Sequence, residues 1–439
     1  MKHSITLGVA CLGRTTFDVA AARGIWAETK KTLAALENVI IVAPDDLVIE
    51  PDEARAAGDL FAKARVDGLV ILSGTFHLGH LALELAKALP TVPLMLWGLP
   101  ELPYDGGKIR LNSVCGVNLN ASNLYKSGIK NYHYTIGTEI DQDWVDAVRV
   151  LARLRTARVG IAGYRAHGFF NLSVADPAIY RATGAIVDHY ELDEIWNAPA
   201  SDADIDRRKA QYRKLFDVSG ISADQLAKVS ALAVKLDYIM ETKSLSAMAI
   251  RCWPEFAARY GVSPCAAMSL LQSEGRILAC EGDVEGALSM LAHQAMGAET
   301  PFLFDFSQVD LKDNFALFWH CGVAPANLWD GRCVRSLDTY FAGGKGVTAD
   351  FVLKDGDLSI VRLDSVDGKY RLFIQNAHVI PMQKLLKGTY MKARFDRPVA
   401  DVLDLVVRNG IAHHASVVYG DYLRPLRLAA RAAGWEVIE

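Results

Sequence analysis

Two segments that carry carboxylates, each after a short apolar run, are the first candidates for chemistry in this sequence. Residues 250–256 have the sequence IRCWPEF and place Glu255 after a proline, and residues 276–283 end in Glu281, Gly and Asp283. Glu281 lies 26 positions after Glu255, a spacing that suits a strand–helix–strand unit. Open parallel sheets bind ligands at the carboxyl ends of their strands, so the two carboxylates could face one cleft.

A metal ion and helix capping are the two explanations for these carboxylates. Two carboxylates in one cleft repel each other unless a proton or a cation lies between them. A divalent metal with oxygen ligands is the simplest partner. Alternatively, Glu255 caps a turn and Glu281 or Asp283 caps the following helix, where negative charge is favoured. Capping is the commoner role of each residue taken singly, but the pair at matching strand ends favours the metal.

A histidine pair is the third candidate. His413 and His414 lie in the segment RNGIAHHASVVYGD, between an Asn-Gly dipeptide and an apolar run that predicts a strand. Adjacent residues of a strand face opposite sides, so we expect at most one of the two imidazoles in a given site. Neutral imidazole is the commonest nitrogen ligand of metals. His320, which ends another apolar run, could contact a substrate or have a purely structural role.

The elements that position these residues fall into three regions. The first third alternates apolar runs with helical patterns, and a second such round begins at Arg158. Strands that alternate with helices of about 10 to 15 residues predict parallel sheets. After His320, segments punctuated by turns such as Asp367-Gly368 predict antiparallel β-structure. We predict an α/β fold with two Rossmann-like, doubly wound domains at 1–155 and 156–320, and a β-rich, barrel-like domain at 321–439.

The composition limits the possible partners. The 439 residues are 51% hydrophobic and 22% charged, with a formal net charge of −4. Such a chain has no strongly basic face for nucleic acid. Its uncharged stretches are shorter than the about 20 residues of a membrane-spanning helix. Seven dispersed cysteines without a C-x-x-C pair favour reduced thiols and a cytoplasmic location.

One glycine-rich segment resembles a phosphate-binding loop only loosely. Residues 343–346, with the sequence GGKG, lack a Ser or Thr after the lysine. They also lie in the β-rich region rather than before a helix, where a phosphate loop belongs. We interpret this segment as a flexible hairpin tip.

Together, the segments resemble the L-fucose isomerase and L-arabinose isomerase superfamily. Five motifs carry the resemblance by their order and spacing: CWPE at 252–255, PCAAMS at 264–269, CEGDVEGALSM at 280–290, FWHCGVAP at 318–325 and GIAHH at 410–414. The N-terminal third matches in its α/β pattern, and LGRTTFD at 12–18 resembles the loop after the first strand. The resemblance implies two α/β domains and a β-rich domain in each subunit.

The resemblance also implies a divalent cation, typically manganese, held by two carboxylates and a histidine. Carried over to this sequence, its ligands are Glu255, Glu281 with Asp283 as competitor, and His413 with His414 as competitor. The central domain would thus supply the carboxylates and the C-terminal domain the histidine.

A homo-oligomer, a trimer or a hexamer, is a further implication, because family active sites lie between subunits. The first domain of the neighbouring subunit closes the pocket, and Arg14 is our candidate for its contribution. Trp253, His320 and Asn409 are the other candidate substrate contacts.

The activity that the resemblance implies is that of a metal-dependent aldose–ketose isomerase, an intramolecular oxidoreductase, on a monosaccharide or sugar derivative. Isomerisation through an enediol requires one proton to leave C2 and another to arrive at C1. A metal can stabilise the developing negative charge, while Glu255 and Glu281 bind the metal and transfer protons. An epimerase or lyase acting on a modified sugar is an alternative. A non-catalytic sugar-binding protein is another, but it leaves the carboxylates and histidines without a role.

Overall fold

The computed structural model describes residues 1–439, which divide into two compact units. The first, here called the N-terminal unit, comprises residues 2–152 and 424–435. The second, here called the main unit, comprises residues 153–423 and 436–439 together with Met1. The division into three domains predicted from the sequence remains a proposal.

The N-terminal unit contains a five-stranded parallel sheet with the order β2-β1-β3-β4-β5. Its strands are β1 (Ile5–Leu12), β2 (Val39–Val42), β3 (Gly68–Ser73), β4 (Leu94–Gly98) and β5 (Tyr132–Ile136). Every residue of β3 and β4 is buried, as expected of parallel strands that are covered on both faces. This is the doubly wound order 2-1-3-4-5, which differs from the order 3-2-1-4-5-6 of dinucleotide-binding Rossmann domains.

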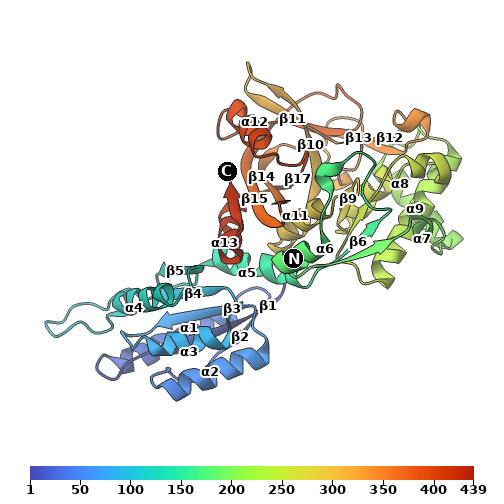
Figure 1. Ribbon diagram of the computed structural model, residues 1–439. Coiled ribbons are helices and arrows are strands. Elements are labelled where there is room, and N and C mark those ends of the chain that lie inside the picture. Colours follow the sequence, from blue (N-terminus) through green and yellow to red (C-terminus); the bar gives the residue numbers. More distant parts are fainter. The chain divides into compact units, whose positions relative to one another are not determined.

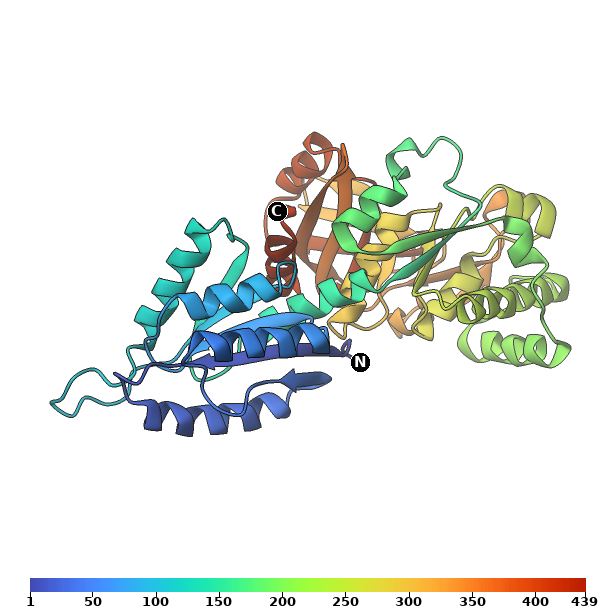
Figure 2. The same cartoon turned by 60° about the horizontal axis from the view of Figure 1, so that its bottom comes forward.

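Helices cover both faces of this sheet. They are α1 (Val19–Ala34), α2 (Pro51–Ala64), α3 (His80–Ala88), α4 (Ser113–Lys126), α5 (Gln142–Arg155) and α13 (Leu423–Ala433). Trp26 of α1 and Trp144 of α5 belong to one hydrophobic cluster, whereas Phe61 of α2 and Leu85 of α3 belong to another. Figure 2 shows α1 and α2 on opposite sides of the strands. None of the helices of the protein has the length and apolar character needed to cross a membrane.

The main unit begins with a four-stranded parallel sheet of order β7-β6-β8-β9. Its strands are β6 (Arg158–Ala162), β7 (Ile186–Tyr190), β8 (Ala247–Ile250) and β9 (Leu278–Cys280). The helices of this region are α6 (Asp176–Thr183), α7 (Leu192–Trp196), α8 (Asp202–Leu215), α9 (Ala223–Thr242), α10 (Cys265–Ser273) and α11 (Val284–Ala295). A π-helical turn, Phe256–Tyr260, follows β8. The structure confirms the predicted α/β class with parallel sheets.

A closed six-stranded antiparallel barrel follows (Figure 1). Around the barrel the order is β10 (Phe302–Asp310), β11 (Phe315–His320), β16 (Thr389–Phe395), β15 (Lys369–Ile380), β14 (Gly356–Val366) and β17 (His414–Tyr419), which returns to β10. The remaining elements are β12 (Ser336–Asp338), β13 (Thr348–Val352), α12 (Val399–Arg408) and β18 (Glu436–Ile438). The predicted barrel-like β-region is confirmed, and β10 and β11 belong to it although they precede residue 321.

A two-residue hairpin turn connects two strands of the barrel, and a shared hydrophobic core holds the barrel against the parallel sheet of the main unit. Asp367 and Gly368, both with positive φ, connect β14 to β15 in the two-residue turn that their sequence predicts. One hydrophobic core contains Ile250 of β8, Phe304 of β10 and Val417 of β17. Because these strands share one core, the end of the sheet and the start of β17 are held close together.

Candidate functional site

Glu281 lies in a tight turn directly after β9. Its φ is 63°, and the φ of Gly282 is 77°. A Cβ on Gly282 would lie 2.4 Å from the carbonyl oxygen of Tyr164, so only glycine fits there. The N–H of Ala166 donates to the carbonyl oxygen of Glu281 at 2.9 Å and holds the turn. A left-handed backbone at a non-glycine residue is unfavourable and concentrates at functional sites, which is consistent with a role for this carboxylate.

Five side chains gather in front of this turn. Glu281 Oε2 lies 3.1 Å from His413 Nε2 and 3.6 Å from His414 Nε2. Asp305 lies 3.4 Å from His414 Nε2 through Oδ1 and 3.9 Å from His320 Nδ1 through Oδ2. Two sets of three, Glu281–His413–His414 and Asp305–His320–His414, have ligand-type atoms that all lie within 4.8 Å of one another. Each set could hold a metal ion, and His414 belongs to both.

The orientation of His414 is set by Asp283. The ring is fully buried, and its Nδ1 donates to Asp283 Oδ2 at 3.0 Å. Asp283 also accepts from Arg362 Nη1 at 2.5 Å and from the N–H of Gly286, at the start of α11. His414 Nε2 therefore points toward Glu281 and Asp305, and it has no hydrogen-bond partner. A carboxylate on the far nitrogen is the usual partner of a histidine that binds metal.

His413 approaches Glu281 from a more open position. Its Nδ1 lies 3.0 Å from Asn171 Nδ2, and its ring centroid is 5.3 Å from that of Phe169. Both histidines thus face Glu281. The expectation that at most one of the two imidazoles enters the site, which assumed that both residues lie in a strand, is therefore wrong. The reason is that β17 begins at His414, so His413 precedes the strand and is free of its alternation.

Charge in the cluster favours a bound cation. Burial opposes protonation of His320, but Asp305, Cys321 and Glu281 together outweigh it and raise the pKa of His320 to about 10. Burial also opposes ionisation of Glu281, but the hydrogen bond with His413 and the nearby His414 and His320 together lower the pKa of Glu281 below its usual value. The site therefore stabilises both an ionised carboxylate and a positive charge beside it.

Glu255 lies outside both sets of possible metal ligands. Arg251, the first residue after β8, lies 3.2 Å from Glu255 Oε1. Glu255 Oε2 is buried and has no hydrogen-bond partner. Its charge is compensated by Arg251, and its second oxygen is left without a hydrogen-bond partner.

The other sequence-based candidates are placed as follows. Trp253 Nε1 donates to Glu281 Oε1 at 3.4 Å, and the Trp253 ring packs edge-on against Phe169. Asn409 ends α12, where its side chain donates to the Leu405 carbonyl oxygen at 2.8 Å. Arg14 lies in the N-terminal unit, where its N–H donates to Thr75 Oγ1.

Asp305 is missing from the sequence-based candidates. It lies 24 positions after Glu281, close to the spacing between Glu255 and Glu281, and it follows an apolar run. That repeated spacing is the sequence signal from which Asp305 could have been predicted. However, Asp305 lies within an antiparallel strand rather than at a turn between strand and helix, and its pairing with His414 comes from the register of β10 and β17.

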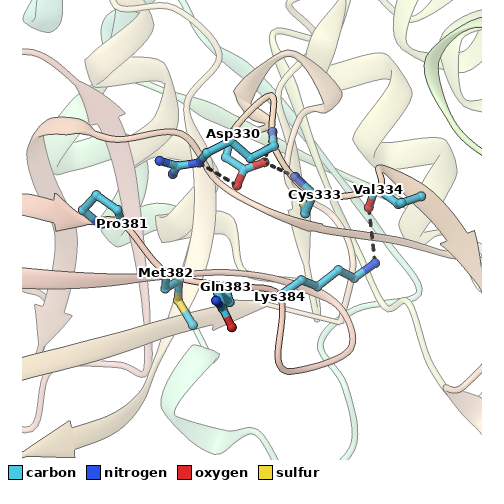
Figure 3. A pocket seen from close by; sticks show the side chains of 8 residues that line it. Asp330, Cys333, Val334, Pro381, Met382, Gln383 and Lys384 are labelled. Atoms are coloured by element: carbon cyan, nitrogen blue, oxygen red, sulfur yellow. Dashed lines mark hydrogen bonds and ion pairs between the residues drawn. The ribbon is translucent and has the colours of Figure 1, made fainter.

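Two of the cavities in the main unit are large enough to hold a small-molecule ligand. One of about 460 Å³ borders the side-chain cluster through Trp253. A larger one of about 840 Å³ lies between the segments around Asp330 and Met382 (Figure 3). Its lysine, Lys384, is paired with Asp350 at 2.8 Å, and its arginine, Arg332, is paired with Asp355 at 2.9 Å. Because its cations are already compensated, we assign the larger cavity no role in the chemistry.

Comparisons with known proteins add an independent line of evidence. Residues 8–159 match the family model described as fucose/sulfoquinovose isomerase, N-terminal domain. The sulfoquinovose isomerase of Priestia aryabhattai is 24% identical over 96% of this chain and 96% of its own. That of Alkalicoccus urumqiensis is 26% identical over 98% of each chain. A solved solute-binding protein from Agrobacterium vitis, bound to α-D-tagatopyranose, covers 68% of this chain and 90% of its own with 11% identity and a TM-score of 0.19, too low to support an argument.

Proposed function

Because this chain belongs to the fucose isomerase-like superfamily and is an aldose–ketose isomerase, we propose that it isomerises a sulfonated aldose at a divalent cation. The substrate we propose is sulfoquinovose, the glucose derivative that carries a sulfonate in place of the C6 hydroxyl. Its support is the name shared by relatives that align over nearly the full length. The observation that carries the proposal is the position of His414, which belongs to both sets of possible ligands and whose Nε2 lies 3.6 Å from Glu281 Oε2 and 3.4 Å from Asp305 Oδ1.

We propose Glu281, Asp305 and His414 as the ligands, with His320 and His413 beside them. The buried Nε2 of His414 has no partner, and a cation between the carboxylates would satisfy it. Carboxylates suit hard ions and imidazole suits softer ones, so this mixed set fits Mn²⁺. Asp283 then acts as a positioning residue, because its oxygens already accept from Arg362, Gly286 and His414.

When bound, the cation would act as a Lewis acid on neighbouring sugar oxygens and stabilise negative charge as the C2 proton leaves. The residues of the chain supply the proton transfer. Glu255 presents a free Oε2, while Arg251 occupies its Oε1, so we propose Glu255 as the group that moves the proton between C2 and C1. Trp253 donates to Glu281 Oε1 and orients that carboxylate, and its ring packs edge-on against Phe169.

Proton exchange in D₂O tests this proposal directly. We expect metal-stripped protein to be inactive on sulfoquinovose, and Mn²⁺ to restore conversion to the ketose with deuterium at the carbon next to the carbonyl. NMR spectra of the products separate the alternatives, because an epimer or a cleavage product would indicate another reaction. Conversion that persists at full rate without metal, or a ketose without deuterium, would contradict the enediol route.

The two adjacent histidines should respond differently to substitution. We expect His414→Gln to weaken Mn²⁺ binding about a hundredfold or more, because it removes the proposed ligand, and to reduce kcat with it. His413→Gln should weaken binding by about tenfold, because its imidazole lies beside the ion and retains Asn171 as a partner. Calorimetric Mn²⁺ titration of both variants measures the difference. A larger loss in His413→Gln would move the ligand role to His413, and equal losses would contradict the difference we propose between the two histidines.

Several expectations of the sequence analysis remain proposals. They are the homo-trimer or hexamer, the contribution of Arg14 to a neighbouring subunit, the contact of Asn409 with substrate and the cytoplasmic location. Light scattering of the purified protein tests the oligomer.

A further inference from the structure

The cavity of about 460 Å³ next to the proposed metal site has the features of a ligand subsite. Its volume lies within the range of about 300–1,000 Å³ that is typical of small-molecule pockets. Trp253, Pro254 and Phe341 supply apolar lining, and Lys345 is the only charged residue that lines it. A mostly apolar pocket with a single cation fits a molecule that is neutral over most of its length and carries one negative group.

Trp253 connects this cavity to the proposed metal site. Its indole N–H donates to Glu281 Oε1, and its side chain also lines the cavity. A sugar with C1 and C2 at Glu281 can therefore lie along the indole and extend its far end into the cavity. Aromatic rings provide large apolar contact area for such a stack.

Lys345 is presented by a well-defined turn between β12 and β13. Ala342, Gly343 and Gly344 have φ values of 52°, 65° and 83°, and the N–H groups of Gly344 and Gly346 both bond to the Phe341 carbonyl oxygen. Gln225 of α9 donates to the Gly344 carbonyl oxygen at 3.1 Å and ties the turn to the helix. The turn thus holds the GGKG segment against the cavity, where Lys345 is exposed.

The charge balance of the cavity favours an anion. No carboxylate lines it, in contrast to the larger cavity, where Asp330 lies 3.3 Å from Arg332. Lysine is a compact point charge on a flexible stem and suits a single tetrahedral anion without strict geometry. A sulfonate carries one negative charge, which matches one lysine, whereas a phosphate monoester carries nearly two at neutral pH.

We propose that this cavity binds the sulfonate end of the sugar and that Lys345 determines the preference for a sulfonated over an uncharged aldose. The inference rests on the proposed isomerase function, because it places the reacting carbons at Glu281. It adds a site for the other end of the substrate, and it gives the GGKG segment a role in binding an anion through a side chain.

The ratio of kcat/KM for sulfoquinovose to kcat/KM for glucose measures this preference. We expect Lys345→Met to lower the ratio about tenfold to a hundredfold, the cost of losing a charged hydrogen bond. Lys345→Arg should retain most of the preference, because the positive charge is kept. Lys312→Met, at an exposed position in the β10–β11 turn, is the matched control and should leave the ratio at its wild-type value. A ratio unchanged by Lys345→Met, or lowered equally by Lys312→Met, overturns the assignment.

Further outcomes separate this inference from the proposed function. A wild-type enzyme that isomerises glucose better than sulfoquinovose overturns the sulfonate subsite and leaves the isomerase intact. A preference for glucose 6-phosphate over sulfoquinovose overturns the inference that Lys345 selects a sulfonate with a single negative charge. If the wild type isomerises none of these sugars, the proposed function fails, and calorimetric titration of the Mn²⁺-loaded protein with each sugar then tests the subsite alone. Tighter binding of sulfoquinovose than of glucose, lost in Lys345→Met, supports the subsite. Equal binding of the two sugars overturns it.

Discussion

An Asp305→Asn variant should fold normally and lose isomerase activity by about a hundredfold to a thousandfold. The substitution keeps the shape of the side chain and removes the charge that lies 3.4 Å from His414 Nε2. A charged group aimed at the reacting centre typically contributes that much to the rate. Asp305 is one-quarter exposed, so the amide can hydrogen bond to water and the fold should not suffer.

Two measurements make the Asp305 prediction specific. The Mn²⁺ affinity should fall together with kcat, whereas the circular dichroism spectrum and the midpoint of denaturation should stay close to those of the wild type. Asp313→Asn, in the exposed turn that follows β10, removes the same charge away from the cluster and should change neither affinity nor rate. Wild-type Mn²⁺ affinity in Asp305→Asn would remove Asp305 from the ligand set.

Arg362→Met should lower the free energy of unfolding by about 3–5 kcal/mol, the usual effect of leaving buried charges without their partner. Arg362 is fully buried, and it lies 2.5 Å from Asp283, 3.6 Å from Glu285 and 3.7 Å from Asp364. Arg371 still pairs with Asp364 in the variant, but Asp283 and Glu285 lose their cation. Because Asp283 orients His414, Mn²⁺ affinity should fall as well.

Chemical denaturation of the main unit measures this loss. Arg207→Met, in α8, is the control, because Arg207 and its partner Asp204 are both solvent-exposed and such pairs contribute about 0–1 kcal/mol. A combined Arg362→Met and Asp283→Asn variant should recover part of the stability, since it removes one of the uncompensated charges. If Arg362→Met and Arg207→Met are equally stable, the buried network is not what holds Asp283.

Local sequence patterns predicted the architecture well. Alternating apolar runs and helical segments predicted the parallel sheets, because a covered parallel strand must be apolar throughout, as β3 and β4 are. The Asp367-Gly368 turn was predictable because few residues adopt the positive φ that a two-residue hairpin requires. The closure of β10 to β17 into one barrel, however, depends on pairings between segments far apart in the chain.

In the candidate site, too, some residues were recognisable from the sequence and others only from their tertiary contacts. Glu281 was recognisable from its place after a short strand, and the histidine pair from its residue types. Asp305 was missed because it faces the site through the register Asp305–His414, which joins residues 109 positions apart. The roles of Asp283 and Glu255 also depended on partners, since Arg362 binds the first and Arg251 pairs with the second.

The sequence by itself determined the α/β class, the β-rich C-terminal region and the types of residue available for chemistry, because strand and turn propensities act over a few neighbouring residues. Only the tertiary structure decided which of those residues meet. It brought Asp305 and His414 together and turned His414 Nε2 inward through Asp283. It also placed Lys345 on a cavity that is lined by Trp253, the residue that donates to Glu281. These contacts arise from barrel closure and a common core, and neither is encoded in any short stretch of the chain.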